Sequence, residues 1–139
     1  MTDILDALRA YLLADDAVAA LCESRVFAVE LPQAQASTMP RSCVVITCAG
    51  GPEKRGTDRI VRGRFDAHSY GETHHLAGQL DRAMYDALRR VRATRVGEVL
   101  LYNVLPSAGP MPMRDTDEGW PVFVRSMTVA ADEREIVDE

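Results

Sequence analysis

The sequence predicts an α+β domain in which helices pack on one face of a mainly antiparallel sheet. Strand patterns, either alternating or rich in β-branched residues, follow one another along most of the chain. Helical spacing of apolar residues is confined to residues 3–21 and to one central segment. Few helices and mostly sequential strands are typical of the α+β class. We expect one long amphipathic helix, a shorter N-terminal helix and an extended hairpin arm.

Length and charge exclude several classes of protein. The 139 residues fit a single domain, predicted to span residues 1–131 and to precede an acidic tail at 132–139. Sixteen Lys and Arg against 21 Asp and Glu give a formal charge of −5, whereas a general nucleic-acid binder is normally basic. No apolar run approaches the roughly 20 residues of a membrane span, and the N-terminus has no secretory signal pattern. We therefore expect an intracellular protein without membrane contact.

The first third of the chain predicts two helices and a strand. A helix over residues 3–14 has one apolar face, made of Ile4, Leu5, Leu8, Tyr11 and Leu12. A shorter helix over 17–21 follows, with Asp16 as its N-cap. Residues 25–29 predict a short strand, and prolines bracket the segment 32–40, which we expect to be irregular.

The central third predicts two strands and the long helix. Residues 43–48 are a continuous apolar run rich in β-branched residues, typical of a strand covered on both faces. Residues 59–69 alternate apolar and polar side chains, which predicts a half-exposed strand. The long helix has a clean apolar face, made of Leu76, Leu80, Ala83, Met84, Ala87, Leu88 and Val91.

The last third predicts a strand and the hairpin arm. Residues 96–105 form an apolar strand that we expect to end before Pro106. Residues 109–131 are predicted to form an irregular hairpin, with its turn at 115–119 and its return strand at 120–129. Because proline lacks an N–H donor, edge positions or bulges are expected for Pro110, Pro112 and Pro121.

The three cysteines predict neither a disulfide framework nor a metal centre. Their number is odd, and Cys43 and Cys48 lie five residues apart, which is not the spacing of a CxxC motif. We expect Cys22, Cys43 and Cys48 to behave as small buried hydrophobic residues, and a zinc or redox role is the alternative.

The three histidines, His68, His74 and His75, lie close together in sequence. Adjacent residues of a helix point about 100° apart, so His74 and His75 do not share a face as metal ligands would. A cluster with Glu72 or Asp66 is the alternative, and it would indicate a small metal-dependent enzyme.

No other pattern indicates catalysis. The sequence has no GxSxG motif. Gly50, Gly51 and Pro52 precede Lys54 without the spacing of a phosphate-binding loop. We predict no catalytic residue, no metal and no cofactor.

Two segments are candidates for interaction surfaces. Four arginines concentrate positive charge in one stretch of an acidic chain: Arg55, Arg59, Arg62 and Arg64. They fit either a solvated strand face or an electrostatic docking surface for a partner or a second copy. Nucleic-acid contact is less favoured, because no aromatic residues are interleaved with the arginines. Met111, Met113 and Trp120 flank the charged hairpin turn, and they fit either a partner surface or a hairpin folded back on its own core.

Four features occur in one order along the chain. The helical segment 4–21 is followed at once by the segment 25–33. A strand ends in Gly50-Gly51-Pro52. The alternating strand 64–71 leads directly into an Ala/Leu/Arg helix, and the arm at 115–129 closes the domain. In this order and spacing the chain, from about residue 3 to 131, resembles the small tail-completion or tail-terminator proteins of long-tailed bacteriophages and prophages.

The resemblance implies a virion structural protein rather than an enzyme. Proteins of this kind form homo-oligomeric rings, usually hexamers, on the head-proximal end of the tail tube. There they stop tube polymerisation and present the head-joining surface. The implied partners are other copies of the chain, the major tail tube protein and the head–tail connector, with DNA only as passing cargo. The implied location is the tail–neck junction of the virion, and the host cytoplasm during assembly.

Three other functions stay open on the sequence. A neck or head–tail connector protein is the alternative within the virion class. A metal-dependent enzyme and a monomeric binding module are the alternatives outside it. For a ring, the arginines and the acidic stretches offer charges of opposite sign. We expect the subunit or tail-docking interface to include Arg55, Arg59, Arg62, Arg64, Met111, Met113, Arg114, Asp115, Asp117, Glu118 and Trp120.

Overall fold

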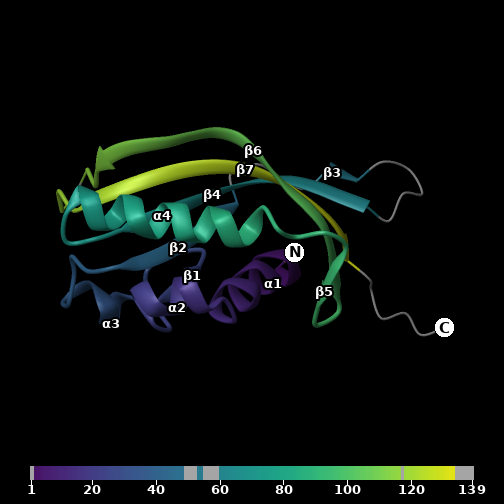
Figure 1. Cartoon of the computed structure of the whole chain (residues 1–139), viewed down its shortest axis with the longest axis horizontal. Coiled ribbons are helices and arrows are strands. Elements are labelled where there is room, and N and C mark those ends of the chain that lie inside the picture. The colour runs from purple at the N-terminus through teal and green to yellow at the C-terminus, as the bar shows by residue number, and fades with distance from the viewer. Residues whose placement is uncertain (1, 49–52, 55–59, 117, 134–139) are drawn as a thin grey trace.

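The computed structural model describes residues 2–48, 53–54, 60–116 and 118–133 (Figure 1). Its elements in chain order are α1 (Thr2–Leu13), α2 (Asp16–Cys22), β1 (Val26–Ala28), α3 (Gln33–Ala36), β2 (Cys43–Cys48), β3 (Glu53–Lys54), β4 (Ile60–Tyr70), α4 (His74–Leu88), β5 (Thr94–Val96), β6 (Val99–Arg114) and β7 (Pro121–Glu133).

The α+β class is confirmed, and the sheet is mixed. Six of its seven described strands follow the order β1-β2-β4-β7-β6-β5, and β3 pairs with the first residues of β4. Strands β1 and β2 pair in parallel, and every other described pair is antiparallel. Figure 1 shows α1, α2 and α4 together on one side of a curved sheet.

The core fills the space between these helices and the inner face of the sheet. Strand β4 alternates as predicted: Val61, Phe65 and Ala67 point inward and are buried, whereas Arg62 and Arg64 are exposed. The helices contribute fully buried side chains to the same cluster, among them Ile4, Leu8, Leu12, Leu80, Met84 and Leu88. Each such side chain stabilises the fold by roughly 1.5–3 kcal/mol.

The prediction of a strand ending before Pro106 is wrong. Strand β6 continues through Pro106, Pro110 and Pro112 to Arg114. Strand β5 pairs only with the first residues of β6, so the rest of β6 is an edge strand among the described elements. An edge strand tolerates proline because its outward N–H groups have no ladder partner. The edge placement predicted for Pro110 and Pro112 is therefore correct, and Pro121 begins β7.

Irregular pairing bends β6 against β7. Register shifts lie between Leu101 and Asn103, between Pro106 and Ala108, and between Ala108 and Met111. At Gly109 the backbone has a φ of +92°, and a Cβ atom there would lie 2.7 Å from the carbonyl oxygen of Val124. Only glycine fits this bulge without displacing the strand.

Three local details differ from the sequence predictions. Asp15, not Asp16, caps α2, because its carboxylate accepts a hydrogen bond from the Val18 N–H at 3.1 Å. The segment 32–40 contains the one-turn helix α3. The predicted acidic tail contributes Asp132 and Glu133 to β7, and residues 134–139 lie outside the described residues.

A buried ion pair fastens α4 to β7. The Arg125 guanidinium donates to both carboxylate oxygens of Asp81, at 2.7 Å and 3.2 Å. The two side chains are only 11% and 4% exposed. The guanidinium also lies 4.1 Å from the ring centre of Tyr85, one helical turn further along α4. The pair thereby fixes the position of the helix along the strand.

We expect Asp81→Ala to lower the free energy of unfolding by about 3–5 kcal/mol, because it leaves the Arg125 charge buried without a partner. Asp86→Ala is the matched control on the same helix, since Asp86 pairs with Arg89 at the surface. Asp86→Ala should lower the free energy of unfolding by less than about 1 kcal/mol. Urea unfolding of both variants measures the difference, and equal losses would contradict the role given to the buried pair.

Candidate assembly surface

The second half of β6, Leu105–Arg114, is exposed along its whole length and is called the β6 arm below. Three of its large apolar side chains lie in water: Leu105 and Met111 are each 54% exposed and Met113 is 42% exposed. Their partners across β7 are Thr128, Val124 and Val122. Directly paired residues share a face of the sheet.

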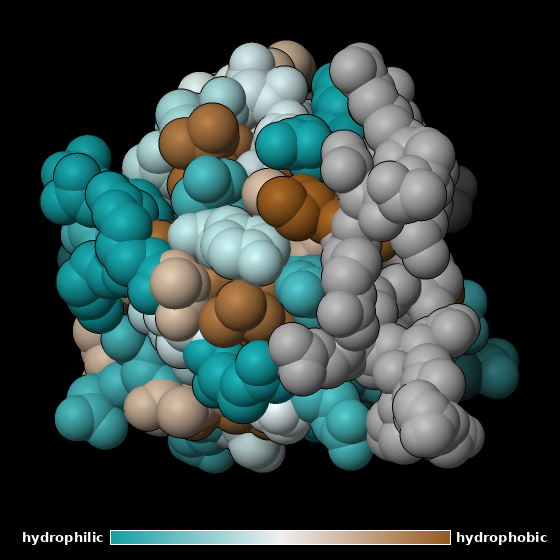
Figure 2. Space-filling model, turned by 90° about the vertical axis from the view of Figure 1, so that its right-hand side faces the viewer, coloured by the Kyte–Doolittle hydropathy of each residue, from teal (hydrophilic) through white to brown (hydrophobic). Residues whose placement is uncertain are grey.

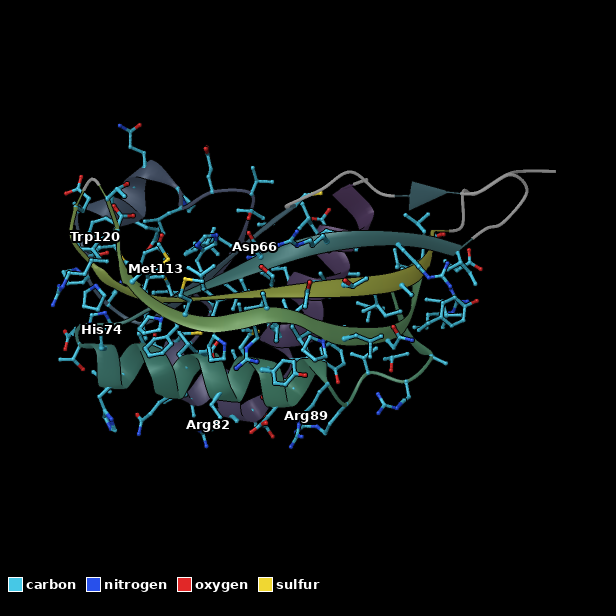
Figure 3. The ribbon with its side chains drawn as sticks, turned by 90° about the horizontal axis from the view of Figure 1, so that it is seen from above. Asp66, His74, Arg82, Arg89, Met113 and Trp120 are labelled. Carbon is cyan, nitrogen blue, oxygen red and sulfur yellow. The ribbon has the colours of Figure 1, made fainter. Side chains whose placement is uncertain are left out.

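The three side chains therefore lie on the outer face, opposite the helices. Single exposed apolar residues are ordinary on a protein surface, but a row of them on one strand marks an interaction site. Figure 3 shows Met113 beside the hairpin end of this strand. The opposite end of the molecule, near β5, differs, since its visible hydrophobic residues are separated by polar ones (Figure 2).

The outer face also carries the described arginines of β4. Arg64 pairs with Thr128, which pairs in turn with Leu105, so these three residues form one row across the sheet. Arg62 lies two residues further along β4 and is also exposed. The structure thus brings part of the predicted arginine cluster onto the same face as the apolar arm, while Arg55 and Arg59 lie outside the described residues.

Trp120 differs from the two methionines. It is partly buried, and its ring meets Tyr70 edge to face, with ring centres 6.1 Å apart. The hairpin turn therefore folds back onto its own sheet at this residue. The two interpretations of the hairpin both apply: it folds back at Trp120, and it exposes Met111 and Met113.

The charged residues of the hairpin turn are partly used within the turn itself. The Arg114 guanidinium donates to the Gly119 carbonyl at 2.9 Å. The Asp115 carboxylate accepts from the Glu118 N–H at 2.9 Å. Asp117 lies outside the described residues. These contacts hold the turn in shape, and the exposed carboxylate of Glu118 adds negative charge beside it.

More arginines flank the arm at its Leu105 end. A groove of about 620 Å³ lies between the end of α4 and β6, lined by Tyr85, Arg89, Arg90, Arg92, Val104, Leu105 and Pro106. Figure 3 shows Arg82 and Arg89 pointing away from the sheet. The sequence pattern missed this cluster, because the arginines follow a helix and Leu105 has the pattern of the last residue of a buried strand.

The described residues do not bring the histidines together. His74 Nε2 lies 2.9 Å from the Met113 carbonyl oxygen, and its ring meets Phe123 edge to face. His75 is exposed on α4, whereas His68 lies half-buried on the outer face of β4. Within the described residues no three His, Cys, Asp or Glu side chains are grouped closely enough to hold a metal ion.

Two of the three cysteines are buried as predicted, and the third is not. Burial raises the pKa of Cys22 to about 11 and that of Cys43 to about 12, so both thiols are protonated at neutral pH. The Cys43 sulfur packs 3.8 Å from the sulfur of Met39. Cys48 is exposed because it ends β2 beyond the buried part of the strand.

Comparisons with known proteins support the fold alone. No model of a known family matches the sequence, and no curated protein matches it. The fold matches a chain of a structure described as "Virion of native gene transfer agent (GTA) particle", with a TM-score of 0.69 and 15% sequence identity. The match covers 93% of this chain and 94% of that chain. Among the described helices, none is long and apolar enough to cross a membrane.

Burial lowers the pKa of His68 below its ordinary value of 6.5, although Asp66 and Asp115 raise it in part. The unfolded chain therefore binds this proton at a higher pH than the folded chain. We expect the free energy of unfolding to decrease as the pH falls below about 6.5. His68→Gln should make this decrease shallower. Urea unfolding between pH 7 and pH 5 gives the slopes of the native chain and the variant, and identical slopes would refute the assignment to His68.

Proposed function

We propose that this chain is a structural protein of a phage-like virion and acts as a tail terminator. In this role it forms a ring on the head-proximal end of the tail tube, stops tube polymerisation and provides the head-joining surface. The observation that carries the proposal is the fold shared with a virion chain over nearly the full length of both chains. The order of sequence features resembling tail-completion proteins points the same way.

The β6 arm supports an assembly role rather than catalysis. Its three large apolar side chains keep about half of their surface in contact with water in the isolated chain, and contact of this surface with water is unfavourable. Partner contact would remove this surface from water at roughly 25 cal/mol for each Å² of apolar area. The arginines on the same face would steer the encounter with an acidic partner surface.

A closed ring requires that one surface of each subunit meets a different surface of the next. Six copies of this chain would carry a formal charge of about −30. Acidic groups lining the lumen would repel DNA and let it pass without adhering. The partners in this account are other copies of the chain, the tail tube protein and the head–tail connector, at the tail–neck junction.

Capping of tail tubes tests the proposal. Tail tube protein from the same genome would be polymerised with and without this chain, and the tube ends would be examined by electron microscopy. We expect one capped end on each tube and an arrest of growth at that end. The triple variant Leu105→Ser, Met111→Ser and Met113→Ser should fold like the native chain, but it should cap tail tubes poorly.

Two other results would overturn this role. Binding to the isolated head connector without binding to the tube would assign the chain to the neck instead. Binding to neither structure would contradict a place at the tail–neck junction. Equal capping by the native chain and the triple variant would show that the β6 arm is not needed for capping, and it would leave the terminator role in place.

A further inference from the structure

The exposed apolar residues of the described chain lie at opposite edges of the sheet. Three of the four large ones belong to the β6 arm, and the fourth is Val29, which is 60% exposed and follows β1. Strand β1 ends the sheet on one side, and the arm ends it on the other. One subunit therefore carries two different apolar edges, as a head-to-tail contact requires.

Val29 is held in an unfavourable backbone conformation. Its φ of +78° lies in the left-handed region, which β-branched residues rarely adopt. The Val29 N–H donates to the Ile46 carbonyl at 2.8 Å, which anchors this conformation to β2. Strained residues are concentrated where a surface meets a ligand or partner. The strained backbone holds the apolar side chain of Val29 at the surface of the single chain, where it is 60% exposed.

The two edges lie at the same level along the strands. Ala28 aligns with Ile46, Ala67 and Arg125 in successive strands, and the next row contains Ser126 and Ala108. Val29 thus lies level with Ala108, midway between Leu105 and Met111 of the arm. Subunits of a ring are related by pure rotation, so two contacting surfaces must lie at one height along the axis.

Residues of opposite charge lie at the two edges. Glu30 is exposed and follows Val29 directly in the chain. On the other edge Arg92 lines a groove together with Pro106. In a contact between the two edges, Glu30 and Arg92 would attract each other.

Backbone pairing is blocked at both edges. The prolines of the arm remove three N–H donors from its free edge. On the other edge, the Arg9 side chain already donates to the Val26 carbonyl at 2.6 Å. Contact between the edges must therefore rely on side-chain packing rather than on an extended sheet.

We infer that the flank of β1, defined as Val29 and Glu30, packs against the β6 arm of the next copy of this chain. This contact is the subunit interface of the proposed ring, and it rests on that proposed function. This contact is also specific, because pairing an arm with an arm, or a β1 flank with a β1 flank, would bring like charges together.

Paired cysteines test the contact. In a Cys48→Ser background, Val29→Cys and Ala108→Cys are combined in one chain, and the protein is oxidised gently at high concentration and on tail tubes. We expect a ladder of linked copies that ends in a closed species. Each single variant should give no ladder, and a mixture of the two singles should give linked pairs only. Val29→Cys with Gln79→Cys, on the exposed face of α4, is the matched control.

The outcomes separate this inference from the proposed function. Rings or capped tubes formed by the double variant without a disulfide between positions 29 and 108 would overturn the interface and leave the terminator role standing. Links within the Val29→Cys single variant would show a symmetric contact and would also overturn it. The absence of both rings and caps would overturn the interface and the function together.

Charge reversal gives an independent measurement. Glu30→Arg and Arg92→Glu should each raise the protein concentration needed for assembly about tenfold, and the double variant should restore the native value. Additive losses in the double variant would place the two charges on separate contacts and contradict the inference.

Discussion

The attachment of α4 to one face of the sheet is the constraint on which the rest of the structure depends. The Asp81–Arg125 ion pair and the apolar face of α4 hold the helix under β4 and β7. A helix in this position covers the centre of the sheet and leaves the side chains of the second half of β6 exposed, although His74 in its first turn reaches the Met113 carbonyl oxygen. The exposed arm follows from the length of β6.

The difference between the covered face and the exposed arm suits a subunit of a larger assembly. One face of the sheet is covered by helices and forms the hydrophobic core within a single copy of the chain. The two edges carry the large exposed apolar residues of the described chain. Prolines and bulges prevent the β6 edge from recruiting other strands without specificity, which is one way in which natural sheets avoid aggregation. Association is thereby limited to surfaces that fit by side-chain shape and charge.

The sequence predicted the elements that depend on local pattern, and it missed those that depend on neighbours. The alternation of β4 and the apolar face of α4 are periodic, so both could be predicted. The continuation of β6 through Pro106 could not, because only the position of a strand in the sheet decides whether proline is tolerated. Likewise, Val29 and Leu105 are ordinary apolar residues in the sequence, and their exposure arises from the sheet order. The row that joins Arg64 to Leu105 spans three strands, so no local sequence pattern indicates it.

The most direct test of this account is the mass of the protein in solution, measured by light scattering over a concentration series. The chain has a mass of 15.3 kDa, so a six-membered ring would have a mass of about 92 kDa. We predict that the native chain approaches this value as its concentration rises. A chain with serine in place of Leu105, Met111 and Met113 should stay at the mass of one copy. Equal masses for the two proteins at every concentration would contradict the claim that the β6 arm is the surface through which this protein assembles.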